Sequence, residues 1–162
     1  MKRNITLLAT AAATLAIALF AVGYGSAASS AASPASSAAG KATRLGAAKS
    51  SLGRIVVDGS SRTVYLFEKD KNRHSACYGA CAQYWPPLLT HGKPVARVGV
   101  KQSLLGMTRR RNGSQQVTYA GHPLYRYAGD TGAGQTNGAG LQDFGGGWDP
   151  ISPSGKKIES GG

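Results

Sequence analysis

Short apolar runs separated by turn residues follow one another along the chain after Ser51. The first two, Arg54–Asp58 and Arg62–Phe67, are rich in β-branched and aromatic residues. The segment between them, Asp58-Gly59-Ser60-Ser61, is typical of a turn, so the two runs predict a hairpin. In a strand the side chains alternate, which places Tyr65 and Phe67 on one face.

A second hairpin is predicted further along the chain. Leu104–Arg110 and Gln115–Tyr119 flank Asn112-Gly113, a dipeptide that strongly favours a two-residue hairpin turn. Additional strands are expected at 123–127, 148–151 and 156–158. The hydrophobic pattern therefore indicates a mostly β domain.

One segment has helical character. Ser75 is a suitable cap for a short helix from Ala76 to Tyr84, and Trp85-Pro86-Pro87 ends it because proline lacks the N–H group. Between Gly129 and Gly147 glycines are frequent and large apolar residues are rare, which predicts a long exposed loop.

A six-residue pattern, tyrosine, any residue, aromatic, any two residues, aspartate, occurs twice at a spacing of 60 residues. Tryptophan and proline follow both copies, so the chain contains an internal duplication. The motif residues are Tyr65, Phe67 and Asp70 in the first copy, and Tyr125, Tyr127 and Asp130 in the second. Each aspartate lies beyond a strand end, where it can accept backbone N–H groups or a tyrosine hydroxyl. The alternative is a carboxylate pair for acid–base chemistry or cation binding.

Four segments are predicted along the chain. Residues 1–28 have the basic start, apolar run and small-residue end of a signal peptide, with an uncleaved membrane anchor as the alternative. Residues 29–51 are rich in Ala and Ser and predict a flexible linker. Residues 52–158 form one domain in which both copies share a core, and 159–162 are a polar tail. Either form of the N-terminus places the domain outside the cytoplasm, in the cell envelope or the medium.

The doubled motif, with Cys77-x-x-x-Cys81 and Trp85-Pro86-Pro87 after the first copy, resembles a bacterial secreted-repeat family of unknown function. Its members are often called lipoproteins with the Yx(FWY)xxD motif. The resemblance covers about residues 52–156 and implies a duplicated, exported domain with no established activity. The chain has no cysteine before Cys77, so the lipid anchor that the family name suggests is not expected in this protein.

Cys77 and Cys81 are the two cysteines of the chain. Export favours their oxidation, and a four-residue spacing on a helix brings the Cα atoms to about 6 Å, within the range of a disulfide. We therefore expect a structural disulfide and no cofactor. The alternative is a redox, copper or haem-handling site that uses both cysteines, with His74 as a further metal ligand.

The formal net charge of the chain is +12, and Lys2 and Arg3 lie in the predicted signal peptide. Arg109, Arg110 and Arg111 adjoin the Asn112-Gly113 turn, and we expect all three to project from the hairpin tip. Anionic wall polymers or a membrane surface are the expected partners of an exported basic protein, and nucleic acid is not. The pattern does not indicate an oligomeric state.

No set of catalytic residues is recognisable in the sequence. The residues therefore predict a non-catalytic envelope or extracellular module built from two diverged repeats and one short helix, with redox chemistry at the cysteine pair as the alternative.

Overall fold

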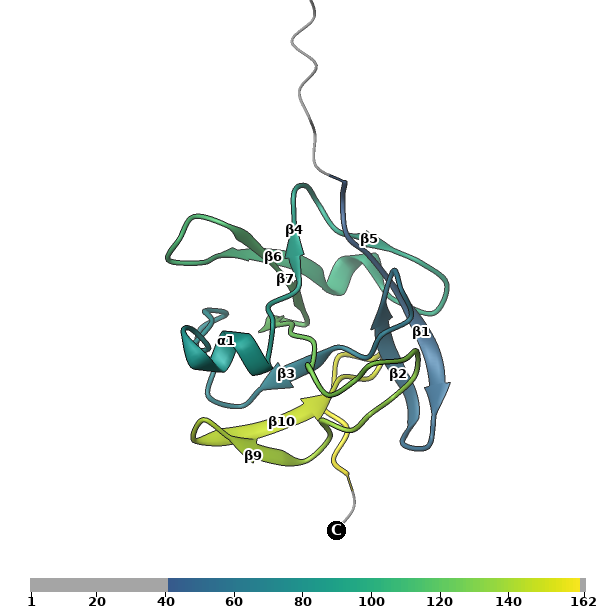
Figure 1. Ribbon diagram of the computed structural model, residues 1–162. Helices are drawn as coiled ribbons and strands as arrows, with labels where there is room; N and C mark the ends of the chain where they lie inside the picture. The colour runs from purple at the N-terminus through teal and green to yellow at the C-terminus, as the bar shows by residue number, and fades with distance from the viewer. Residues whose placement is uncertain (1–40, 161–162) are drawn as a thin grey trace, which may run out of the picture. The chain divides into compact units, whose positions relative to one another are not determined.

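The structure is a computed structural model that describes residues 41–160 (Figure 1). The predicted signal peptide and the first part of the predicted linker lie outside these residues. The described part is mostly strand, with one short α-helix, α1 (Ala80–Tyr84), and one turn of 3-10 helix, η1 (Gln102–Leu104). No helix in this part is long and apolar enough to cross a membrane. The prediction of a mostly β domain with one short helix is confirmed.

Three small sheets make up the domain, and two of them lie around the first motif copy. One has the order β2-β1-β5, in which β1 and β2 are antiparallel and β1 and β5 are parallel. The next has the order β3-β10-β9 and is antiparallel throughout. The strand bounds are β1 (Arg44–Ser50), β2 (Gly53–Asp58), β3 (Tyr65–Phe67), β5 (Val95–Ala96), β9 (Leu141–Asp143) and β10 (Gly146–Pro150).

The third sheet contains the hairpin predicted around Asn112-Gly113. Its strands β6 (Leu105–Arg109) and β7 (Gln115–Tyr119) pair in an antiparallel register. Two short strands, β4 (Leu89–Thr90) and β8 (His122–Pro123), add to β7. This hairpin is predicted by its turn chemistry, and the structure forms it within one residue of the expected ends.

The two repeats exchange their C-terminal segments. We call residues 44–90 the first repeat and 105–151 the second. The Leu88 carbonyl of the first repeat accepts the Val117 N–H of the second at 2.8 Å, and the Ile151 carbonyl of the second accepts the Val56 N–H of the first at 2.8 Å. β3 of the first repeat likewise pairs with β10 of the second. Each repeat therefore completes a sheet of the other.

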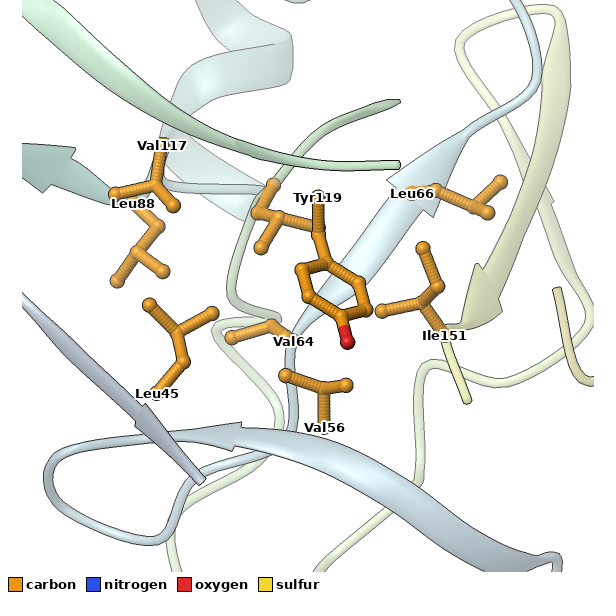
Figure 2. Packing of buried hydrophobic residues seen from close by; sticks show 9 residues of the cluster. Leu45, Val56, Val64, Leu66, Leu88, Val117, Tyr119 and Ile151 are labelled. Atoms are coloured by element: carbon orange, nitrogen blue, oxygen red, sulfur yellow. The ribbon is translucent and has the colours of Figure 1, made fainter. Parts of the chain in front are cut away.

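Two hydrophobic clusters form the core. The first is mainly aliphatic and takes residues from both repeats, as Figure 2 shows: Leu45, Val56, Val64, Leu66, Leu88, Val117, Tyr119, Leu124 and Ile151. The second is mainly aromatic and surrounds the cysteines: Tyr65, Phe67, Cys77, Cys81, Trp85, Tyr125 and Trp148. Burial of apolar surface shared by both repeats is the main source of stability.

The structure corrects the predicted end of the linker. Residues 44–50 form β1, which pairs along its length with β2, instead of belonging to a flexible linker through Ser51. The composition of this stretch is poor in large residues, but Leu45 is fully buried in the core. This segment is a strand because its backbone pairs with β2 and because Leu45 is buried. Its amino-acid composition alone does not predict a strand.

Three further expectations need correction. The hairpin of 54–58 with 62–67 is reduced to a bridge between Val57 and Thr63, since β1 is the main partner of β2. The helix begins at Ala80 instead of Ala76, and its N-cap, Gly79, has a φ of 57° and no side-chain cap. The glycine-rich stretch from 129 to 147 is not all exposed loop, because Asp130 and Gly138 are buried and β9 lies within it.

Candidate functional site

The two motif copies bind each other through their tyrosines and aspartates. The Tyr65 hydroxyl donates to Asp130 Oδ2 at 2.5 Å, and the Tyr125 hydroxyl donates to Asp70 Oδ2 at 2.9 Å. The backbones of the two tyrosines also pair, with both N–H···O distances between 2.9 and 3.0 Å. The motif therefore joins the two repeats, because the tyrosine of each copy donates to the aspartate of the other copy.

Both aspartates have the same local role. The Asp70 N–H donates to the carbonyl of Phe67, and the Asp130 N–H donates to the carbonyl of Tyr127. The second carboxylate oxygen accepts a backbone N–H, from Ala76 for Asp70 and from Asn137 for Asp130. Each carboxylate thus closes a turn and holds a tyrosine of the other repeat. No hydrogen bond joins the two carboxylates, and the structure gives no support to an acid–base pair.

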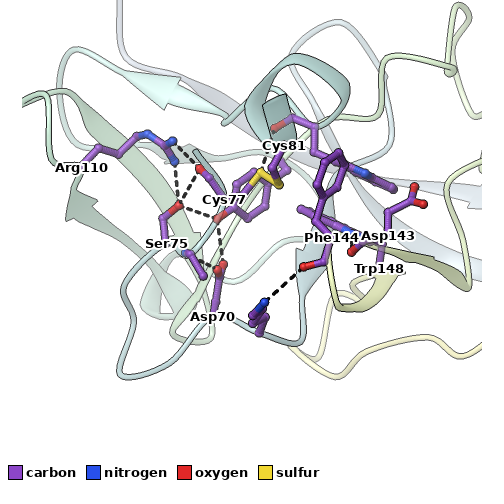
Figure 3. The surroundings of a disulfide bond; sticks show 12 residues. Asp70, Ser75, Cys77, Cys81, Arg110, Asp143, Phe144 and Trp148 are labelled. Atoms are coloured by element: carbon purple, nitrogen blue, oxygen red, sulfur yellow. Dashed lines mark hydrogen bonds between the residues drawn. A yellow bond between two sulfur atoms is a disulfide. The ribbon is translucent and has the colours of Figure 1, made fainter. Parts of the chain in front are cut away.

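A chain of polar side chains extends from Asp70 to the cysteine segment (Figure 3). The Tyr125 hydroxyl lies 2.7 Å from Ser75 Oγ, which accepts Arg110 Nη1 at 2.8 Å. Arg110 Nη2 donates to the carbonyl of Cys77 at 2.7 Å, and Nη1 also donates to Gln116 Oε1 at 2.6 Å. Ser75 therefore belongs to this network and does not cap the helix as expected.

The predicted disulfide between Cys77 and Cys81 is present, with a Cα–Cα distance of 5.3 Å. Cys77 is fully buried and Cys81 is 6% exposed, within the aromatic cluster. Since both sulfurs are joined, neither is available as a metal ligand together with His74 in this oxidised form. The burial supports the structural interpretation of the pair.

The arginine run at the hairpin does not project as one group. Arg110 is 6% exposed and its guanidinium is bound by Ser75, Gln116 and Cys77. Arg109 and Arg111 are exposed, and the guanidinium of Arg111 lies 4.5 Å from the ring centroid of Tyr78. The expectation that all three arginines project from the hairpin tip is wrong for Arg110, because alternate residues along an extended chain face opposite sides.

Burial raises the pKa of Asp70 to about 6, against the ordinary 3.8, and the hydrogen bonds from Ala76 and Tyr125, with the charge of Arg110, offset this effect only in part. The folded state therefore holds the Asp70 proton more tightly than the unfolded state. The stabilisation is present below pH 4 and is lost as the pH rises through 6. Since the carboxyl is partly exposed, we expect a loss of about 2 kcal/mol.

Urea unfolding between pH 4 and pH 7 measures this dependence. The Asp70→Asn variant should lose less stability over this range than the wild type, by about 2 kcal/mol. The wild type in the same buffers is the reference. An unchanged slope in Asp70→Asn contradicts the raised pKa.

A separate cleft of about 340 Å³ is lined by four basic residues from three segments of the chain. These residues are Lys41 before β1, Arg44 at the start of β1, Arg97 directly after β5 and Arg126 directly after Tyr125. Lys41, Arg44 and Arg97 are exposed. We call this group the basic cleft.

Sequence reasoning missed the basic cleft because its cations are spread over more than eighty residues. Tertiary structure brings them together: the parallel pairing of β1 with β5 aligns Arg44 with Val95, two residues before Arg97, and Arg126 is held by its ion pair with Asp58 at the end of β2. No spacing rule connects these positions. The burial of Arg110, in contrast, has a signal in the sequence, since alternation along a strand separates it from its two neighbours.

The comparisons with known proteins give one match. A family described as a secreted repeat of unknown function matches residues 46–89 and again residues 106–152. These two stretches coincide with the two repeats of the structure to within two residues at each end and cover more than half of the chain. No curated protein and no solved structure matches significantly.

Proposed function

Because the chain belongs to this family of secreted repeats of unknown function, we propose that it is an exported, non-catalytic envelope module that adsorbs to anionic envelope polymers. Adsorption of this kind depends on the net field of the protein surface and is weakened by salt. The proposal therefore concerns the charges that face solvent.

The observation that carries the proposal is the separation of charges between interior and surface. Three carboxylates, Asp58, Asp130 and Asp149, are at most 6% exposed. The exposed acids Glu68 and Glu159 both pair with Lys157, at 2.6 and 3.1 Å. Over residues 41–160, Arg126 and Lys157 are the basic residues paired with a carboxylate. The other exposed lysines and arginines of residues 41–160 form no ion pair with a carboxylate.

The state of the internal carboxylates supports a non-catalytic role. The carboxylates of Asp70 and Asp130 each accept hydrogen bonds from a tyrosine hydroxyl and a backbone N–H. The carboxylate of Asp58 accepts two backbone N–H groups and the side chain of Arg126. Among residues 41–160, no cluster of three or more histidine, cysteine or acidic residues has the geometry to hold a metal ion. The arrangement serves to hold the repeats together and to present cations.

Co-sedimentation with bacterial cell walls tests the proposal. We expect the purified domain to bind walls that carry an anionic polymer, and the bound fraction to fall roughly tenfold between about 50 and 200 mM salt. Walls chemically stripped of the anionic polymer are the matched control and should retain little protein. Binding that does not depend on salt, or equal binding to stripped walls, would contradict the proposal.

A further inference from the structure

We propose that the basic cleft is the binding site for a run of phosphate groups in a linear polymer. The inference rests on the proposed adsorption to anionic envelope material and adds to it a site and a chemical class of ligand. Its support comes from the positions of the four cations, their partners and the absence of competing acids at the described residues that line the cleft.

The fold fixes the backbone of three cleft cations independently of any ligand. Arg44 belongs to β1, which pairs with β2 on one side and β5 on the other. The Arg97 N–H donates to the carbonyl of Leu45 at 2.7 Å, and the Arg126 N–H donates to the carbonyl of Pro86 at 2.8 Å. The backbone at these three positions is therefore held by hydrogen bonds, which lowers the entropic cost of ordering it on binding.

Arg126 is also oriented through its side chain. Its Nε donates to Asp58 Oδ2 at 2.6 Å, and the Asp58 side chain is fully buried. The other Asp58 oxygen accepts the N–H groups of Ser60 and Arg62, so this carboxylate is saturated by the turn it closes. Asp58 thus holds the guanidinium of Arg126, a residue that lines the cleft.

Three of the four cleft cations, Lys41, Arg44 and Arg97, form no ion pair with a carboxylate among residues 41–160, whereas Arg126 is paired with Asp58. Within the described part of the chain no acidic residue lines the cleft. The acids Glu68, Asp149 and Glu159 line a different pocket, together with Lys157. Cations held in one cleft repel each other and focus a positive potential there, which a bound anion relieves.

The composition of the cleft favours phosphate. Three of the four cations are arginines, whose guanidinium forks match phosphate oxygens and stay charged at all physiological pH values. A phosphate is tetrahedral and presents its oxygens out of a single plane, which suits cations that come from three segments of the chain. Four cations line this cleft of about 340 Å³, so a ligand with several negative charges fits it better than a single anion. A polymer with a phosphate in each unit has such charges.

The test measures binding of long-chain inorganic polyphosphate by calorimetry at several salt concentrations. The variant Arg44→Ser/Arg97→Ser removes two exposed cleft cations, and Arg109→Ser/Arg111→Ser removes the same charge from the hairpin tip. We expect the cleft variant to bind at least tenfold more weakly. The slope of log K against log salt should fall by about 1 for each cation removed. The hairpin variant should stay within about threefold of the wild type.

The outcomes separate the site from the general proposal. Equal losses in the two variants, with salt-dependent binding retained by the wild type, overturn the cleft but leave adsorption standing. Absence of salt-sensitive binding by the wild type overturns both. Polygalacturonate, which carries carboxylates, is the second probe, and binding as tight as that of polyphosphate overturns the assignment to phosphate. Circular dichroism verifies that both variants are folded.

Discussion

Neither repeat is expected to fold alone. A chain of residues 41–101 should lack cooperative unfolding, and so should a chain of residues 102–160. The physical reason is the exchange of segments: β3 loses its partner β10, and β7 loses its partner β4. Each fragment also exposes one tyrosine and one aspartate that are otherwise satisfied by the other fragment. Far-ultraviolet circular dichroism and urea unfolding measure the result.

An equimolar mixture of the two fragments is the matched control. We expect it to recover strand signal and a cooperative transition whose midpoint depends on concentration, because the complete core forms only in the complex. A cooperative transition in either fragment alone would contradict the interlocked arrangement of the repeats.

Trp148→Ala should destabilise the domain strongly. The Trp148 ring is fully buried and stacks between Phe67 and Trp85, with ring centroids 4.0 and 3.9 Å away. Its loss leaves a large cavity in the aromatic cluster, where Tyr125 also meets the ring edge-on at 5.1 Å. We expect a loss of about 4 kcal/mol in the free energy of unfolding, measured in urea.

Phe144→Ala is the control for Trp148→Ala. Phe144 is an aromatic residue of the same sheet region, in the turn between β9 and β10, but its side chain is 41% exposed. Its removal should cost less than about 1 kcal/mol. Comparable losses in the two variants would mean that the ring stack does not hold the repeats together.

The sequence predicts local structure well where the turn chemistry is strong. Asn112-Gly113 defines the β6–β7 hairpin because this dipeptide tolerates the positive φ of the turn, which is 84° at Gly113. The helix starts later than its sequence predicts because Ser75 is used by Arg110 and Tyr125, which are distant in the sequence. Helix propensity depends on local sequence and carries no information on a hydrogen-bond partner from the other repeat.

The tyrosine–aspartate motif is recognisable in the sequence, but its reciprocity is not. A repeat in sequence suggests two equivalent units, and each copy alone is compatible with a tyrosine bound to the aspartate of its own copy. The structure instead pairs Tyr65 with Asp130 and Tyr125 with Asp70. Two-residue alternation assigns a face to a side chain and carries no information on which strand lies opposite.

The interlocked core bears directly on the proposed function. Because each repeat completes the other, the basic cleft contains Lys41, Arg44 and Arg97 from the N-terminal half of the domain and Arg126 from the second repeat. Loss of the interlock should therefore abolish the cleft along with the fold. In our proposal, the disulfide and the aromatic stack hold the scaffold together and the cleft cations contact the polymer.

Nuclear magnetic resonance shift mapping of the intact domain with polyphosphate tests the central claim most directly. We expect the largest amide shifts at residues 41–44, 59–60, 97 and 126, which form the basic cleft, and we expect them to disappear as salt is raised. Shifts concentrated at 109–111, or spread evenly over the surface, would contradict the assignment of the polymer to this cleft.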